Sequence, residues 1–268
     1  MSEPWKDEPG RTSHGRRGPL LNTDPGVSAI VDNALALNAS FAAALGCRTH
    51  EDHGVAAIDA ECPGHRRAIV VAPCLDTAEA VAGLRSFFSP KGAWVLEDPF
   101  GSFDGESAGL VRADTTVLFR YDPRPGEVLD PGLTLRRVDD RTDLEIAERI
   151  VAEGFEQPEL AAAPPGSLYP RTILDDSAVS ILLAVVAGEP AATVMSYHDG
   201  RSTGLYWGAT LHTMRRRGLC GGLIKALMNE HPHTPTLGSS GAMSQSRFRE
   251  FGYRELGPST WWLWPGDG

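Results

Sequence analysis

The amino-acid sequence predicts an α+β protein in which a mixed central sheet is flanked by helices, with a second, smaller α+β domain at the N-terminal end. Helical and strand-like apolar periodicities alternate along most of the chain, so helices and strands are interspersed. Two stretches rich in Pro and Gly, residues 122–126 and 130–132, interrupt this pattern near its middle. The 268 residues suffice for two domains of ordinary size. We therefore expect a disordered tail over 1–25, an N-terminal domain over 26–125, a linker over 126–132 and a larger domain over 133–268.

The expected N-terminal domain opens with a long helix rich in Ala and Leu over 28–45, which Gly46 ends as a C-cap. A second helix is expected over 76–88, with its start marked by Asp76. The strands expected in this domain cover 55–60, 68–72, 93–96 and 115–121.

The expected C-terminal domain contains a helix whose start is marked by a capping-box pattern, Thr142 followed by Glu145. An antiparallel hairpin is expected over 180–197. A strand over 203–211 leads directly into a helix over 218–230. The remaining elements expected are strands over 133–138, 234–237 and 261–264 and a helix over 244–251.

Composition is typical of a soluble globular protein, with 41% hydrophobic and 22% charged residues. The formal net charge of −10 argues against a nucleic-acid partner, because such binding depends on cationic contacts to phosphate, and it is compatible with a cationic amine. No uninterrupted apolar run approaches the roughly 20 residues of a membrane span. The first residues are polar and basic, unlike a signal peptide. Scattered cysteines fit reduced thiols, so we expect a cytoplasmic protein.

The most informative segment joins a strand, a turn and the Gly-rich start of a helix. Residues 205–211 read LYWGATL, and residues 212–222 read HTMRRRGLCGG. Backbone N–H groups and a helix N-terminus converge there, which suits a diphosphate. The spacing Arg215-x-x-Gly218-x-Cys220 resembles the acyl-CoA diphosphate loop, Gln/Arg-x-x-Gly-x-Gly/Ala, of the GCN5-related N-acetyltransferase (GNAT) family. Cys occupies the sixth position, but Gly221 and Gly222 follow and leave room for close backbone approach.

This resemblance covers roughly residues 133–265 and implies the acyl-CoA N-acyltransferase (GNAT) fold. It also implies transfer of an acetyl or other acyl group from acetyl-CoA to a primary amine, without a metal. The N-terminal domain shows a similar succession of elements but no diphosphate motif before the helix at 76–88. A degenerate copy of the fold, as in tandem family members, and a distinct α+β domain are both open, and so is a homodimer.

The resemblance further implies where the cofactor binds. The oxyanion would be stabilised by a backbone N–H at the end of strand 203–211, with Leu211 as the donor, and pantetheine would pair with the same strand edge. The cofactor-binding residues implied are Ala209, Thr210, Leu211, Arg215, Arg216, Arg217, Gly218, Leu219, Cys220, Gly221 and Phe248.

The acid and the base of the reaction are not fixed by motif. Phe248 stands where the family pattern Tyr-x-x-x-Gly-Phe has Tyr, and a phenyl ring cannot donate a proton. Ser244 and Ser246 on the same helix, or water, are the alternatives for protonating the thiolate. Strand 203–211 contains no carboxylate. The candidate bases are His198, Glu153, Glu156, Tyr206 and His212.

Two rival interpretations follow from particular residues. Phe248 and the missing strand carboxylate are also compatible with a non-catalytic acyl-CoA-binding regulatory module. A zinc-dependent protein would use a cluster of potential ligands, although none of their spacings matches the familiar Cys-x-x-Cys knuckle, so we expect no metal. These potential ligands are Cys47, His50, His53, Cys62 and His65.

Overall fold

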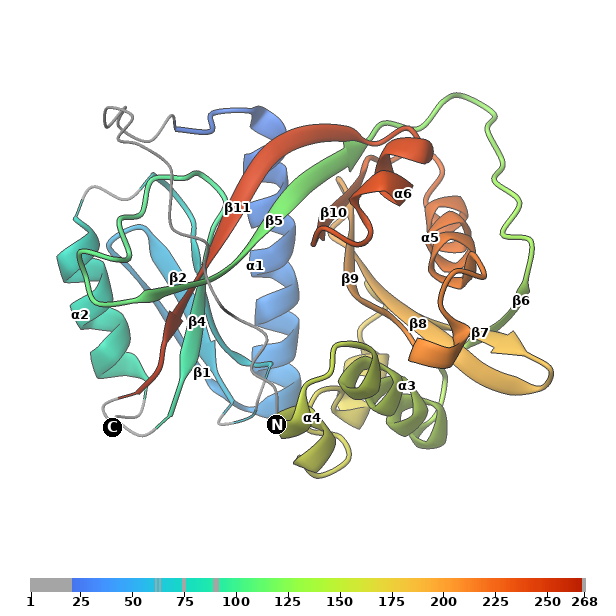
Figure 1. Cartoon of the computed structure of the whole chain (residues 1–268), viewed down its shortest axis with the longest axis horizontal. Helices are drawn as coiled ribbons and strands as arrows, with labels where there is room; N and C mark the ends of the chain where they lie inside the picture. Colours follow the sequence, from blue (N-terminus) through green and yellow to red (C-terminus); the bar gives the residue numbers. More distant parts are fainter. Residues whose placement is uncertain (1–20, 61, 63, 74–75, 89–91, 267–268) are drawn as a thin grey trace, which may run out of the picture.

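The computed structural model describes residues 21–266 except 61, 63, 74, 75 and 89–91. Most of the tail expected over 1–25, namely residues 1–20, lies outside the described residues. In the described part, one 11-stranded sheet has the order β1-β2-β3-β4-β11-β5-β10-β9-β8-β7-β6. Figure 1 shows α2 beside one end of this sheet, α5 and α6 toward the other, and α1 between them. The mixed sheet flanked by helices is the predicted fold class.

The strands follow the predicted positions, with one addition at the start of the chain. The hairpin expected over 180–197 is present as β7 and β8, and the unexpected strand β1 forms one edge of the sheet. The strands are β1 (Arg48–Asp52), β2 (Val55–Asp59), β3 (Arg66–Val70), β4 (Trp94–Asp98), β5 (Val111–Tyr121), β6 (Thr134–Arg137), β7 (Val179–Val186), β8 (Glu189–His198), β9 (Thr203–Thr210), β10 (Thr236–Ser240) and β11 (Arg254–Trp264).

Helix ends follow their capping signals, with one correction. Gly46 ends α1 in the left-handed conformation with φ 64°, and the Asp76 side chain caps α2 as predicted. For α3 the N-cap is Asp140, whose carboxylate accepts from the Asp143 N–H at 2.9 Å, so the capping box expected at Thr142 is not formed. The helices are α1 (Pro25–Leu45), α2 (Thr77–Phe87), α3 (Arg141–Gly154), α4 (Pro158–Ala162), α5 (Leu219–Glu230) and α6 (Gln245–Glu250), with the 3-10 turns η1 (Arg171–Asp175) and η2 (His212–Met214).

The sheet has a helix on each face around β7, β8 and β9. Phe41 of α1 and Ile150 of α3 share a buried cluster with Leu183 of β7. Leu223 of α5 belongs to a different cluster that includes the neighbouring strand residue Leu182. Since successive strand residues point to opposite faces, α1 and α3 lie on one face, called here the α1 face, and α5 lies on the other.

The two longest strands join the two parts of the chain. β5 lies between β10 and β11, and β11 lies between β4 and β5 (Figure 1). A similar unit occurs on each side of this pair, because α2 connects the parallel strands β3 and β4 and α5 connects the parallel strands β9 and β10. The sheet is therefore continuous across the linker expected over 126–132, and the division into two domains stays a prediction.

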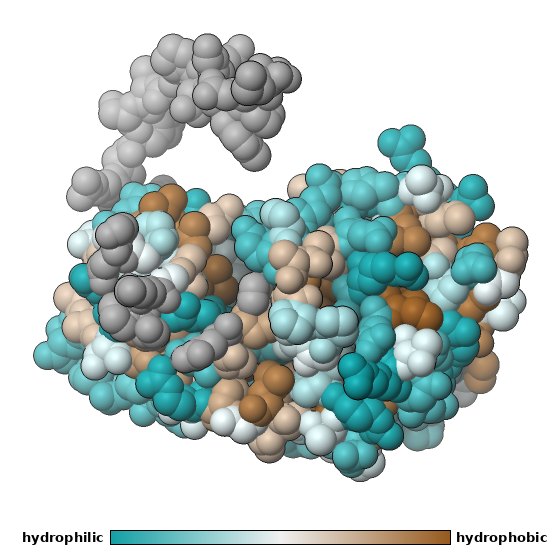
Figure 2. Space-filling model, turned by 90° about the horizontal axis from the view of Figure 1, so that it is seen from below, coloured by the Kyte–Doolittle hydropathy of each residue, from teal (hydrophilic) through white to brown (hydrophobic). Residues whose placement is uncertain are grey.

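Helix α1 is long and apolar enough to cross a membrane by length and composition alone, which the sequence expectation overlooked. Half of its apolar window is buried inside the protein, where Val27, Leu37 and Phe41 belong to the core. This burial is typical of a core helix. Figure 2 shows the underside of the molecule, where apolar residues form small patches among hydrophilic ones.

Candidate functional site

Strands β9 and β10 separate soon after they begin. They pair in parallel only over Thr203–Leu205 and Thr236–Gly238. β9 then continues along β8 to Thr210, with a bulge at Trp207, whose φ is 53°. The edge of β9 that faces β10 therefore leaves the ladder after Leu205.

The register of β9 decides which N–H groups face this unpaired edge. The N–H of Leu211 donates to the Ala191 carbonyl of the neighbouring β8 chain at 3.0 Å. Because N–H groups alternate between the two edges of a strand, those of Gly208 and Thr210 point away from β8. The donor expected for the oxyanion, the Leu211 N–H, is thus already engaged with β8.

The start of α5 presents further unpaired donors beside that edge. Arg216 and Gly218 turn the chain with φ values of 64° and 77°, and Gly218, the N-cap, has no side chain to satisfy the first turn. The N–H groups of Leu219, Cys220 and Gly221 belong to this first turn and have no partner within the helix. Since α5 is 12 residues long, its dipole adds a favourable field for an anion at this end.

The three arginines of the loop have different surroundings. Arg215 is half-buried, and its Nη2 donates to the Gly154 carbonyl at the end of α3 at 2.7 Å. It therefore anchors the loop to α3. Arg216 and Arg217 are exposed beside the start of α5, where they can contact an anionic ligand.

The glycines that follow Cys220 are required by internal contacts, and the backbone approach expected at them stays a prediction. A Cβ at Gly221 would lie 2.6 Å from the Phe251 ring, and one at Gly222 would lie 2.0 Å from the Leu133 side chain. Both residues are buried. The Sγ of Cys220 lies 3.6 Å from where a Gly208 Cβ would be, and burial raises the pKa of this thiol to about 11.

Phe248 packs in the core rather than at the cofactor. It is 7% exposed and stacks on Phe119 with ring centroids 5.0 Å apart. Tyr253 contacts its other side, edge to face at 4.9 Å. Ser244 and Ser246, the alternative acids, are both exposed at α6.

Three candidate bases lie near the diphosphate loop. Glu153 and Glu156 are exposed at the end of α3, and Glu156 pairs with His212 at 3.0 Å. His212 directly follows Leu211, so this exposed pair borders the loop.

The other two candidate bases face elsewhere. His198 pairs with Thr203, the first residue of β9, and its ring stacks on His231 with centroids 3.7 Å apart. The loop follows the last residue of β9, so His198 lies roughly 20 Å from it along the strand. This position removes it from the expected reaction centre. The hydroxyl of Tyr206 donates to Asn33 Oδ1 at 2.7 Å, and burial raises its pKa well above the ordinary value.

The potential zinc ligands of the rival interpretation are dispersed. Among residues 21–266, as far as described, no three His, Cys, Asp or Glu side chains are grouped to hold a metal ion. His65 is buried against Phe41, with Nε2 2.8 Å from the Leu168 carbonyl, and burial lowers its pKa to about 4. The Sγ of Cys62 donates to the Ser167 carbonyl at 3.2 Å. His53 lies near Asp52 and Glu79 instead.

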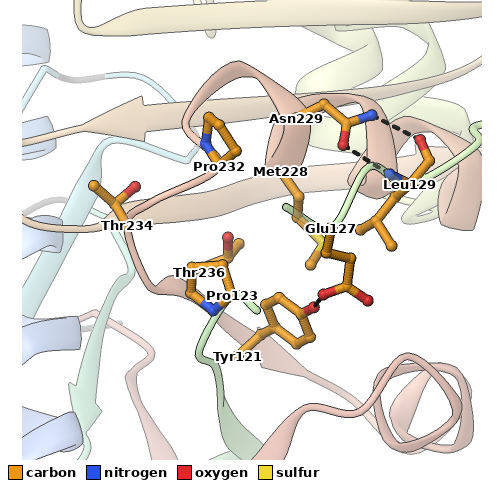
Figure 3. A pocket seen from close by; sticks show the side chains of 9 residues that line it. All are labelled: Tyr121, Pro123, Glu127, Leu129, Met228, Asn229, Pro232, Thr234 and Thr236. Carbon is orange, nitrogen blue, oxygen red and sulfur yellow. Dashed lines mark hydrogen bonds between the residues drawn. The ribbon is translucent and has the colours of Figure 1, made fainter. Parts of the chain in front are cut away.

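A small, open pocket lies at the opposite end of α5 (Figure 3). The Asn229 side chain bonds both the N–H and the carbonyl of Leu129, at 3.0 and 2.7 Å. The Tyr121 hydroxyl donates to Glu127. These contacts tie the 123–131 segment to α5 and to the end of β5, so the pocket walls serve the connection between the two parts of the chain.

Sequence reasoning missed a buried charged pair on the α1 face. Glu97 of β4 is fully enclosed, and its Oε2 lies 3.8 Å from Nη2 of Arg67 on β3. Its Oε1 accepts from the Ser259 hydroxyl at 3.0 Å. The guanidinium of Arg67 also lies over the Trp261 ring. In the sequence, Arg67 follows Arg66 at the start of one strand and Glu97 precedes Asp98 at the end of another, where charged residues are usually solvated.

Comparisons with known proteins show which fold the chain shares. No protein-family model and no curated protein sequence matches the chain. Solved structures do match, and they define a class: the fold is that of the GCN5-related N-acetyltransferases.

Three particular structures illustrate the likeness. A GCN5-related N-acetyltransferase from Kribbella flavida has a TM-score of 0.62 at 19% identity, covering 90% of this chain and 96% of its own. A protein assigned to the GNAT family from Novosphingobium aromaticivorans has a TM-score of 0.58 at 18% identity, with coverages of 89% and 97%. A GCN5-related N-acetyltransferase from Sphaerobacter thermophilus reaches 0.50 at 12% identity, with coverages of 90% and 93%.

Proposed function

We propose that the protein is an N-acyltransferase that transfers an acetyl or other acyl group from its coenzyme A thioester to a primary amine. One observation carries the proposal. The uncapped first turn of α5 lies next to the edge of β9 that β10 leaves unpaired. A diphosphate and an extended amide-containing arm require these two features side by side. The shared fold supports the same conclusion.

The coenzyme is held mainly by backbone groups. The N–H groups at the start of α5 bind the diphosphate, and Arg216 and Arg217 add positive charge. The pantetheine arm runs along β9 and pairs with Thr210. This places the thioester carbonyl at Gly208, whose N–H points to the same edge.

The transfer itself is a direct displacement. The lone pair of the neutral amine forms the C–N bond, and the carbonyl oxygen carries the developing negative charge toward the Gly208 N–H. The C–S bond then breaks, and the proton that the nitrogen loses is passed through water to the departing sulfur, so the coenzyme leaves as a thiol. Phe248 does not supply that proton, since it is a buried phenyl ring.

The test measures binding and turnover separately. Acetyl-CoA titrated calorimetrically should bind, and thiol release should require an added amine. The double variant Arg216→Glu with Arg217→Glu should weaken binding about tenfold or more, since it reverses the charges facing the diphosphate. Arg201→Glu is the matched control, because Arg201 is exposed near the other end of β9. Its ion pair with Asp32, at 3.8 Å, is also exposed, so losing it should cost little stability.

Three results bear on the proposal. Binding that survives the double charge reversal would contradict the assigned coenzyme site. Binding without thiol release across amines would favour the non-catalytic module, for which the buried Phe248 is the motivating observation. No binding at all would refute both.

A further inference from the structure

The charged pair Arg67–Glu97 faces β9 across the α1 face of the sheet. Its two strands lie several positions from β9 in the sheet order, yet the charges of both residues act on the Tyr206 hydroxyl. Both charges therefore lie within electrostatic range of Tyr206, a residue of the strand that we assign to the coenzyme. Asn33 of α1 holds Tyr206 in this region.

The Arg67 side of the pair has unused hydrogen-bonding capacity. The 3.8 Å between Arg67 Nη2 and Glu97 Oε2 exceeds hydrogen-bond length. Arg67 Nε is buried without a hydrogen-bond partner among the described residues. A buried N–H of a charged group left unpaired is costly, so a carboxylate that used the Nε and Nη2 fork would be bound favourably.

Solvent can reach this region along β5. The strand is exposed on both faces from Val111 to Thr115. Asp114 pairs with Trp261 and therefore shares its face, next to the ring over which Arg67 lies. The Trp261 Nε1 donates to Thr116 Oγ1 at 3.2 Å, which continues a polar surface from the pair toward β10.

We propose that Arg67 and Glu97 bind the acyl acceptor, and that the acceptor is a zwitterionic amino acid. Its carboxylate binds Arg67, and its ammonium group binds Glu97, which takes up one proton so that the neutral amine can attack the thioester. The inference rests on the proposed function, since it names the substrate class of that reaction. A simple alkylamine is repelled by Arg67 about as strongly as Glu97 attracts it, whereas a zwitterion matches both charges.

The experiment compares each amino acid with its own carboxamide as acceptor, using thiol release with acetyl-CoA. The wild-type protein should prefer the free acid by roughly ten- to a hundredfold in kcat/KM, the worth of hydrogen bonds to a charged group. Arg67→Met should abolish this preference while the calorimetric affinity for acetyl-CoA stays unchanged. Arg112→Met is the matched control, because Arg112 lies over Trp262 on the opposite face and should leave the preference intact.

The outcomes separate this inference from the proposed function. Acetyl-CoA binding and amine-dependent turnover without a preference for the free acid would overturn the inference alone, as would a preference that persists in Arg67→Met. Absence of acetyl-CoA binding would overturn the proposed function and the inference with it. If Arg67→Met fails to fold because Glu97 is left unpaired, the double variant with Glu97→Gln removes both buried charges and is measured in its place.

Discussion

The substitution Gly222→Ala tests whether the Gly-rich start of α5 is needed for contacts inside the protein or for the approach of a ligand. Replacing Gly222 with Ala would place a Cβ 2.0 Å from Leu133 Cδ2 and 2.5 Å from the Pro131 carbonyl oxygen. Ordinary carbon contacts lie at about 3.5–4.0 Å, so the separation must grow by roughly 1.5 Å. The carbonyl belongs to the backbone, and a change of rotamer cannot relieve this contact. Helix α5 and the segment that leads into β6 must move apart.

The cost follows from two opposing effects. Overpacking of this kind costs about 1–3 kcal/mol, and the preference of a helix for Ala over Gly returns up to about 1 kcal/mol. The expected net loss is about 1–2 kcal/mol, or roughly 2–8 °C in Tm for a chain of this size. Thermal unfolding of the protein without coenzyme measures it directly.

The control for this prediction is Gly241→Ala. A Cβ at Gly241 meets nothing within 4 Å, so this variant should unfold at the wild-type temperature or slightly above. If Gly222→Ala unfolds at the same temperature as Gly241→Ala and only loses affinity for acetyl-CoA, the glycine serves the ligand and our reasoning from internal contacts is wrong.

Two further predictions concern the reaction and the pH dependence of stability. Gly208→Pro removes the N–H assigned to the oxyanion and should lower kcat by roughly 10²–10³; Gly208→Ala keeps the N–H, places its methyl 3.6 Å from Cys220 Sγ and should leave kcat unchanged. Equal losses in the two variants, in protein with wild-type Tm, would count against the assignment. Burial lowers the pKa of His65 from 6.5 to about 4, so between these values the unfolded chain binds a proton that the folded protein does not. Stability contributed by this group therefore falls as the pH falls through this window, by about 2 kcal/mol at about pH 5. Urea unfolding near neutral pH and near pH 5 should show a smaller difference in His65→Gln, and an unchanged difference would contradict the assignment to His65.

Local signals in the sequence were sufficient for most elements. Gly46 and Asp76 mark helix ends because a left-handed C-cap and a side-chain N-cap depend on neighbouring residues alone. At α3 the sequence offers two residues that can cap a helix, Asp140 and Thr142, and the structure uses Asp140. The short, exposed β1 has charged and polar residues throughout, so its strand character comes only from pairing with β2.

The details of the site depend on relationships that the sequence does not carry. Which N–H faces the unpaired edge of β9 depends on strand register, and a bulge at Trp207 changes that register between Thr193 and Met195. Arg67 and Glu97 meet because β3 and β4 are parallel neighbours, a pairing between distant residues. From the sequence alone, charged residues at these positions are expected to be solvated residues at the ends of strands.

The position of β11 between β4 and β5 has a consequence for the order in which the sheet can form. β11 is translated after every other strand, yet it fills the space between β4 and β5. The sheet of the first-made part thus stays open until β11 has been translated, with β4 and β5 lacking their shared neighbour. A chain released before β11 would expose two unprotected strand edges, which favour aggregation.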